Sequence, residues 1–356
     1  MNHNSNRSSP RRAFGVAAAA LASVGLYWAS HAAFFALDDQ PIASIGALEF
    51  SAFDLSRGGA VAFRGDYIRA TWDGDLVAYD MAANGAAAVK WRARTRLATA
   101  AWDTGRKIVT SSASGSGVGL RWNGSPALTT AQQAALGDAT EGPKVLAYLR
   151  GDATHERTPT NPGGSYRQRF SKIGAVVHAR PYYHDHGVDT AGNATARVYV
   201  GANDGMLHAF DAGTGNEVFA YVPSMLFGKL RDLTIASSTT FRYYVDGLLA
   251  VAPVTVGSTT RTMLIGGLGS GAKGLYGLDV SNPTPADEAA AAAMAKFEIT
   301  EASTGFANLG NVFGAPQIVK LNNGATVALV PNGVNSSAGV ASLFVINPTT
   351  GALVRN

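Results

Sequence analysis

RVYVGANDGMLHAFDAGTGNEVFAYVP, residues 197–223, contains three short strands and the two turns that join them. Residues 198–201 are apolar with two β-branched valines, and residues 206–211 alternate between apolar and polar, which is the period of a half-buried strand. Between them, Asn203-Asp204-Gly205 has the composition of a tight hairpin turn, because these residue types tolerate positive φ angles. The stretch therefore predicts an antiparallel β unit.

The unit continues through a second turn at residues 212–215 to a third strand at residues 217–222. A unit of this size buries too little surface to be stable alone. LFVINPTTGALV (residues 343–354) repeats its strand, turn and TG pair, and LYGLDVSNP (275–283) and LVAYDMAANG (76–85) repeat its first half. Radial stacking of such copies buries both faces of each sheet, so we expect an all-β fold of the β-propeller type, with a β-sandwich as the alternative.

The composition is typical of an exported, β-rich protein. Charged residues make up only 15% of the 356 residues, and there are 41 glycines. The absence of cysteine excludes a disulfide framework, a thiolate metal site and a cysteine nucleophile.

The first 32 residues resemble an export signal. Arg7, Arg11 and Arg12 precede an apolar run at residues 13–27, and small residues place cleavage near Ala32. The run is short for a membrane span, so we expect a cleaved signal peptide rather than an anchor. The arginine pair also fits a twin-arginine signal, although the rest of that motif is absent.

Removal of this leader changes the charge balance. It contains three of the 29 basic residues and no acidic residue, which leaves 26 basic against 25 acidic side chains. The mature chain is then almost neutral, so we expect no broad basic face that could bind nucleic acid. Once the leader is removed, we also expect no membrane span.

The chain divides into the signal peptide at 1–32, a propeller-proximal β segment with a helical connection at 33–150, and propeller blades at 151–356. A turn at Asp73-Gly74 separates two strands, Thr130 caps a short helix at residues 131–136, and Thr284 caps an inserted helix. Further strands are expected at residues 67–71, 76–79, 90–94, 107–110, 118–122, 173–183, 262–266, 275–280, 297–299, 317–321, 326–330 and 342–346.

At this point the sequence resembles a known family. The 198–223 stretch is similar to the blade motif of quinoprotein-type propellers. The PilY1/PilC family of type IV pilus tip-associated adhesins has segments similar to the following five, in the same order: LAYLRGD (146–152), YRQRFSKIGAVVHARPYYH (166–184), YYVDGLLAVAPV (243–254), TMLIGGLGSGAKGLYGLDVSNP (262–283) and FGAPQIVKLNNG (313–324). The resemblance runs from about residue 72 to the C-terminus.

The resemblance implies a quinoprotein-like propeller that is exported through the periplasm to the pilus tip, cell surface or outer membrane. Such a protein is a non-enzymatic pilus biogenesis factor and adhesin, with pilins or minor pilins and a host or abiotic surface as partners. The family's large N-terminal region is missing here. At roughly 40–50 residues per blade we expect about four of seven blades, and hence a truncated or split member.

No cofactor is evident in the sequence. The resemblance implies calcium, but the family's aspartate-rich DxDxDxxxD loop is absent. Two other functions remain as alternatives: a periplasmic quinoprotein-like redox protein and an outer-membrane assembly scaffold. Redox quinoproteins of the alcohol dehydrogenase type typically use a vicinal disulfide, and lipoprotein scaffolds need a lipidated cysteine. The absence of cysteine excludes both features.

One polar segment holds weak candidates for metal binding. His184 and His186 would face the same side of a strand, and with a carboxylate such a pair can bind zinc. Asp185 and Asp189 could instead offer oxygens to calcium. His178 is nearby in the sequence. Neither spacing is a recognised ligand set, so we expect a solvated loop here and no metal site.

The tripeptide Arg150-Gly151-Asp152 is a candidate adhesion motif, because integrins can bind Arg-Gly-Asp on an exposed loop. It lies where a helix meets a polar loop, and Gly151 is also explained as a helix C-cap. A second copy, Arg64-Gly65-Asp66, lies within a strand pattern and is the weaker candidate.

No residue pattern predicts catalysis. Residues 269–274 match G-x-G-x-x-G, but a strand follows where a phosphate-binding loop requires a helix, so we expect a hairpin loop. No serine lies in a G-x-S-x-G elbow. His208 lies within the 207–211 strand and is expected to be a packed or edge residue.

Overall fold

The computed structural model describes residues 48–51, 59–68, 70–112, 115–235 and 241–355. The signal peptide expected at residues 1–32 lies outside the described residues. Among the helices of the described ranges, none is long and apolar enough to cross a membrane.

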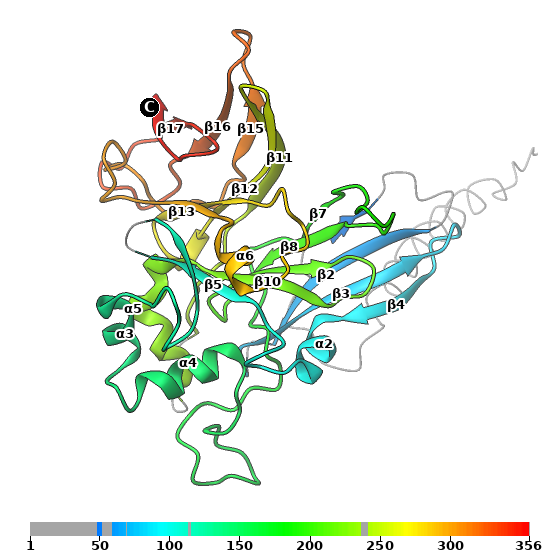
Figure 1. Cartoon of the computed structure of the whole chain (residues 1–356), viewed down its shortest axis with the longest axis vertical. Coiled ribbons are helices and arrows are strands. Elements are labelled where there is room, and N and C mark those ends of the chain that lie inside the picture. The colour runs from blue at the N-terminus through cyan, green and yellow to red at the C-terminus, as the bar shows by residue number, and fades with distance from the viewer. Residues whose placement is uncertain (1–47, 52–58, 69, 113–114, 236–240, 356) are drawn as a thin grey trace, which may run out of the picture.

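The described chain contains four sheets, each with a set of four consecutive antiparallel strands (Figure 1). Sheet 1 contains β1 (Leu48–Phe50), β2 (Ala60–Ile68), β3 (Asp73–Met81) and β4 (Ala87–Arg92). Sheet 2 contains β7 (Tyr182–His184), β8 (Arg197–Gly201), β9 (Leu207–Asp211) and β10 (Glu217–Val222). Sheet 3 contains β11 (Leu249–Val256), β12 (Thr259–Gly267), β13 (Gly274–Asp279) and β14 (Ala295–Thr300). Sheet 4 contains β15 (Gln317–Lys320), β16 (Thr326–Pro331), β17 (Leu343–Ile346) and β18 (Leu353–Arg355).

Two further strands extend sheet 2. β5 (Ile108–Ser111) pairs in parallel with β10, and β6 (Gly117–Gly119) pairs with β5. Sheet 2 therefore has six strands and takes them from both sides of residue 150, where we expected a domain boundary.

The helices are short; most of them connect one sheet to the next in sequence, whereas η4 and α6 lie within sheet 3, before and after β13. Figure 1 shows α3, α4 and α5 gathered at one corner of the molecule. The α-helices are α2 (Ala93–Thr99), α3 (Thr130–Leu136), α4 (Gly142–Arg150), α5 (Phe227–Leu230) and α6 (Glu288–Ala292), and the 3₁₀ helices are η2 (Ser224–Leu226), η3 (Arg231–Thr234) and η4 (Gly269–Gly271).

The repeated sequence unit has the same place in every sheet. LVAYD, LHAFD, LYGLD and LFVI form β3, β9, β13 and β17, which are the third strands of the four sheets. The first strands of consecutive sheets contact one another, β1 with β7, β7 with β11, and β11 with β15. Sequence repetition thus coincides with a radial succession of four-stranded sheets, which confirms the predicted all-β propeller.

Each junction between consecutive sheets has its own apolar core. Apolar side chains of one sheet pack against those of the next, and the cluster between sheets 2 and 3 also takes in helices α3 and α4. Representative buried residues are Phe63, Leu76 and Phe210 between sheets 1 and 2, Tyr199, Leu207 and Tyr276 between sheets 2 and 3, and Leu275, Val330 and Phe344 between sheets 3 and 4.

The Thr-Gly turn that follows the repeated strand packs against an aromatic ring of the preceding sheet. Gly215 has φ 75°, and a Cβ at this position would lie 2.4 Å from the Trp91 ring in β4. The Trp91 indole also donates a hydrogen bond of 3.0 Å to the carbonyl of Ala212. Gly351 meets Phe297 of β14 in the same way, with φ 72° and 2.7 Å. This explains why the turn contains glycine and why it recurs.

The Asp73-Gly74 turn prediction was wrong. Both residues begin β3, and the turn precedes them. Asp73 Oδ1 accepts hydrogen bonds from the backbone of Phe170 and Ser171, and a Cβ on Gly74 would lie 1.9 Å from the carbonyl oxygen of Gly174. Asp73 and Gly74 are therefore required where sheet 1 closely approaches the segment that enters sheet 2, and they do not form a hairpin turn.

The helix caps differ from those expected. Thr129 rather than Thr130 caps α3, in a capping box with Gln132. Asp287 rather than Thr284 caps α6, by accepting a hydrogen bond from the backbone of Ala290. In both cases the better-placed side-chain oxygen lies closer to the first free backbone amides.

Candidate functional site

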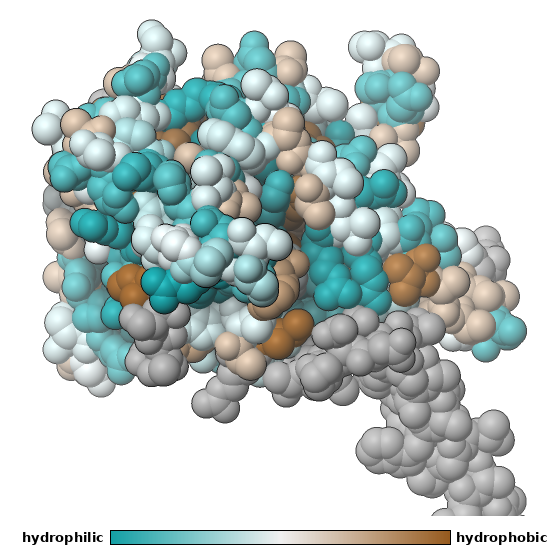
Figure 2. Space-filling view, turned by 90° about the horizontal axis from the view of Figure 1, so that it is seen from below, coloured by the Kyte–Doolittle hydropathy of each residue, from teal (hydrophilic) through white to brown (hydrophobic). Residues whose placement is uncertain are grey.

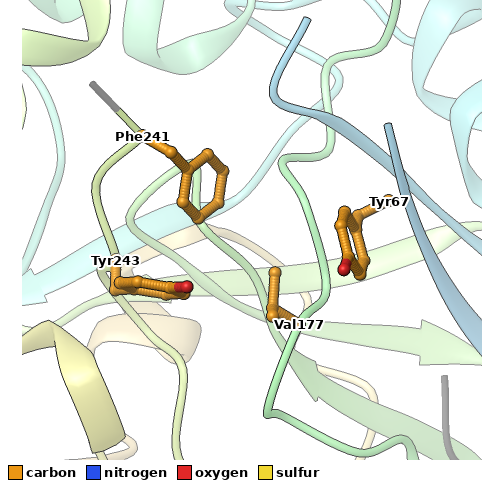
Figure 3. Close-up of a pocket in the computed structure, with 4 residues that line it drawn as sticks. All are labelled: Tyr67, Val177, Phe241 and Tyr243. Carbon is orange, nitrogen blue, oxygen red and sulfur yellow. The ribbon is translucent and has the colours of Figure 1, made fainter. Parts of the chain in front are cut away.

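A pocket lies at the end of the propeller where the loops between second and third strands meet the segments that enter the next sheet. It has a volume of about 360 Å³ and is lined by Tyr67, Val177, Phe241 and Tyr243 (Figure 3). Tyr67 lies near the end of β2, Val177 precedes β7, and the other two precede β11. The pocket therefore forms where three sheets converge.

The lining combines ring faces with hydroxyl groups. The rings of Phe241 and Tyr243 are 5.0 Å apart at 82°, an edge-to-face pair, and Trp72 packs against Phe241 at 5.9 Å. In Figure 3 the hydroxyls of Tyr67 and Tyr243 point toward the space between them, over Val177. The Tyr67 hydroxyl is a group that can both donate and accept a hydrogen bond at the pocket wall.

A histidine beside the pocket is held by a buried carboxylate. Asp246 is fully buried, and its two oxygens accept hydrogen bonds from the backbone amide of His178 at 3.1 Å and from His178 Nδ1 at 2.5 Å. Asn203 donates to the same carboxylate at 3.4 Å. His178 is 45% exposed. Because Nδ1 bonds to Asp246, Nε2 is the ring nitrogen left to form a hydrogen bond with a ligand.

The imidazole connects the pocket to the fourth sheet. The His178 ring lies 5.4 Å from Tyr243 and 5.5 Å from Phe313, which precedes β15. His178 before sheet 2, Tyr243 before sheet 3 and Phe313 before sheet 4 thus form one aromatic group, and Tyr67 of sheet 1 lines the pocket together with Tyr243. All four sheets contribute to a single surface at this end.

Sequence reasoning did not single out this group. It placed His178 beside the histidines at 184 and 186, whereas the structure pairs it with Asp246, 68 residues away. A usable signal was present: Asp246 is a charged residue within the apolar run YYVDGLL, and a buried carboxylate requires a partner.

The four weak metal candidates do not converge. The rings of His184 and His186 lie 4.5 Å apart, and His186 shares a hydrogen bond of 2.9 Å with the Tyr199 hydroxyl. Burial, assisted by the charge of His184, lowers the pKa of His186 to about 4. Asp185 accepts from the backbone of its own turn.

Asp189 is likewise used within its loop, where Oδ1 accepts hydrogen bonds from the backbone amides of Ala191 and Asn193. Across the described ranges, no three His, Asp or Glu side chains form a group that could hold a metal. Within these ranges the calcium that the resemblance implies is therefore offered no such cluster of carboxylates.

The arginine of the Arg150-Gly151-Asp152 tripeptide is buried and is not accessible to a partner. Gly151 is the C-cap of α4, with φ 119°, and the Arg150 side chain is 1% exposed. Its guanidinium donates to Glu288 and to backbone carbonyls. In the second copy, Arg64 is also 1% exposed and bonds Asp66 through two nitrogens, at 2.7 and 2.8 Å. Neither geometry suits recognition of the arginine by a partner.

His208 belongs to a buried network of charged side chains. It is fully buried between the carboxylates of Asp204 at 3.0 Å and Glu217 at 2.8 Å, and Arg106 holds Glu217. Burial alone would lower the pKa of His208, but the two carboxylates outweigh it and raise the pKa to about 9. A charged, enclosed imidazole of this kind stabilises sheet 2 and cannot reach a substrate.

The Gly-rich stretch at 269–274 forms η4 and then enters β13. A strand rather than a helix follows it, as expected, so no helix N-terminus is offered to a phosphate.

Figure 2 shows one face of the molecule on which hydrophilic residues predominate and hydrophobic residues occur singly or in small groups. Another pocket in the described ranges, of about 440 Å³, has charged side chains in its lining, among them Glu141, Arg157 and Arg231. The aromatic lining distinguishes the pocket at Tyr67 from that one.

Comparison with known proteins identifies relatives of the chain. The sequence profile of the PilY1 beta-propeller domain matches residues 176–356. The type IV pilus biogenesis factor PilY1 homolog of Xylella fastidiosa is 34% identical over 317 residues, which cover 82% of this chain and 24% of that protein. Type IV pilus biogenesis factor PilY1 of Pseudomonas aeruginosa strain PAK is 33% identical over 318 residues, covering 80% and 26%. The chain spans about a quarter of the length of these relatives.

Two solved structures are also similar. The C-terminal domain of Pseudomonas aeruginosa PilY1 is 38% identical with a TM-score of 0.35, covering 45% of this chain and 29% of that chain. The quinohemoprotein alcohol dehydrogenase from Comamonas testosteroni is 10% identical with a TM-score of 0.32, covering 83% and 44%.

Proposed function

Since this chain belongs to the PilY1 family of β-propeller proteins, we propose that it acts in type IV pilus biogenesis as a non-enzymatic binding protein and tip-associated adhesin. Its relatives are named type IV pilus biogenesis factors, which supports the proposed role in pilus biogenesis. In this proposal the mature protein is exported through the periplasm to the pilus tip or cell surface, where it contacts pilins or minor pilins.

The loop end of the propeller is the proposed attachment surface. The observation that carries this is the pocket formed by Tyr67, Phe241 and Tyr243, with His178 held in place by Asp246. Loops on a rigid scaffold are the usual position of binding residues in such folds. A mixed aromatic and hydroxyl lining is also typical of binding sites. Calcium is given no part in this proposal.

Deletion of the gene tests the biogenesis role. We expect fewer surface pili, less twitching and less attachment, all restored when the intact gene is returned. The measurements are pilin released by shearing, the width of twitching zones and the number of attached cells. Unchanged piliation and attachment in the deletion strain would contradict the proposal.

A further inference from the structure

We propose that the loop-end pocket binds a neutral sugar ring. This inference deepens the proposed function and rests on it, because it names the ligand class of the same attachment surface.

The lining offers two kinds of contact to one ligand. The faces of Phe241 and Tyr243 are apolar surfaces against which the C–H face of a pyranose can stack, and their edge-to-face arrangement holds both rings in place. The Tyr67 hydroxyl can donate and accept hydrogen bonds, as ring hydroxyls of a sugar require. Stacking faces beside hydroxyl groups are complementary to a molecule that is apolar on one face and polar at its edge.

His178 adds an oriented polar group next to the rings. Asp246 fixes the half-exposed imidazole through Nδ1, so that Nε2 is left to form a hydrogen bond with a sugar hydroxyl, which can both donate and accept. The ring of His178 is also in contact with Tyr243. A polar group that is oriented before binding loses little conformational freedom when the ligand arrives.

The charges nearby argue against ionic ligands. The described residues that line the pocket are uncharged. The nearby carboxylate, Asp246, is fully buried and already accepts hydrogen bonds from His178 and Asn203, so it is not presented to a cation. The Arg167 guanidinium stacks on Trp72 and donates to the carbonyl of Thr71, so it is engaged within the protein. A neutral ligand is therefore favoured.

The volume sets the size of the ligand. At about 360 Å³ the pocket is near the lower end of the range of about 300–1,000 Å³ that is usual for small-molecule sites. It can thus enclose a terminal sugar unit rather than a long oligosaccharide.

The test is ligand-observed NMR of the purified full chain with methyl glycosides of glucose, galactose, mannose and N-acetylglucosamine. We expect saturation transfer to at least one glycoside. Phe241→Ala should weaken its binding about tenfold or more, since an aromatic anchor is lost. Tyr67→Phe, which keeps the ring, should weaken it about fivefold through the lost hydroxyl. Phe170→Ala is the matched control, because Phe170 is 68% exposed and lies outside this pocket.

Two comparison ligands identify other classes of partner. N-acetyl-tyrosine amide represents an aromatic peptide side chain, and tetramethylammonium represents a cation that aromatic rings can enclose. Binding of either one without any glycoside would overturn the inference, as would the binding of no probe. Equal effects of Phe241→Ala and Phe170→Ala would overturn it too.

Periodate treatment distinguishes the source of the sugar. If the sugar belongs to the surface to which cells attach, oxidation of that surface should abolish binding of the purified chain, whereas oxidation of purified pili should not. The reverse result would place the sugar on the pilus itself. Loss of binding with neither treatment would contradict a sugar ligand. The proposed function is tested separately by cell attachment, so either proposal can fail alone.

Discussion

We expect Trp91→Ala to lower the free energy of unfolding by about 4 kcal/mol, because it removes a large buried ring at the junction of sheets 1 and 2. Trp91 is 4% exposed and packs against Phe63 at 5.9 Å and Phe210 at 6.2 Å. The substitution also removes the hydrogen bond to the Ala212 carbonyl and the ring that covers Gly215. Urea unfolding followed by circular dichroism measures the change.

Two variants serve as controls for this result. Trp91→Phe keeps a six-membered aromatic ring but loses the rest of the indole and its N–H, so its cost should be smaller, about 1–2 kcal/mol. Val89→Ala lies on the same strand at a position that is 40% exposed, and we expect a change of about 0.5 kcal/mol or less. If Trp91→Ala behaved like Val89→Ala, the docking of the TG turn on Trp91 would not hold the sheets together.

Arg150→Ala should destabilise the protein by about 3–5 kcal/mol, because it breaks a buried network of charge-assisted hydrogen bonds. The guanidinium donates to Glu288 at 2.8 Å and to the carbonyls of Leu120, Asp103 and Arg106 at 2.8–3.0 Å. Without it the carbonyls of Leu120 and Arg106 lose this donor, whereas Glu288 and the Asp103 carbonyl keep hydrogen bonds from Arg121. Urea unfolding again gives the magnitude. Arg150→Lys should not restore it, since one ammonium cannot reach all four acceptors.

Asp152→Ala is the matched control from the same tripeptide. Its exposed carboxylate accepts hydrogen bonds only from the backbone and hydroxyl of Thr154 among the described residues, so stability should change by about 1 kcal/mol or less. Because Arg150 is buried, we also expect attachment to be unaffected. A loss of attachment in Asp152→Ala at unchanged stability would restore the tripeptide as an adhesion motif.

The parts of the fold that sequence predicts well are those that local patterns determine. β8, β9 and β10 follow from alternation and from turn residues, and the repetition of this unit identifies the propeller. Gly151 as the C-cap of α4 follows from the same local logic.

The parts it misses depend on contacts between distant segments. Residues 90–94 were expected to form a strand, yet α2 begins at Ala93, where the Arg94 amide donates to the Asp75 carboxylate of β3. Nothing in the local pattern reveals that partner. β11 (Leu249–Val256) contains a proline and lacks clear alternation, and it becomes a strand through its pairing with β12.

The same limit explains the functional site. The wall of the pocket brings together residues 67, 177, 241 and 243, which become neighbours only when three sheets are in place. His178 and Asp246 are likewise partners only in the folded chain. The sequence shows that Asp246 is a charged residue in an apolar run and needs a partner, but it does not show that His178 is that partner.

The most direct test of the loop end as the attachment surface is the number of attached cells per piliated cell. The gene deletion is complemented with the Phe241→Ala/Tyr243→Ala variant or with Phe170→Ala, and piliation is measured in the same cultures. We predict normal piliation with both variants and a several-fold loss of attachment with the double variant alone. Equal attachment of the two strains at equal piliation would contradict the account.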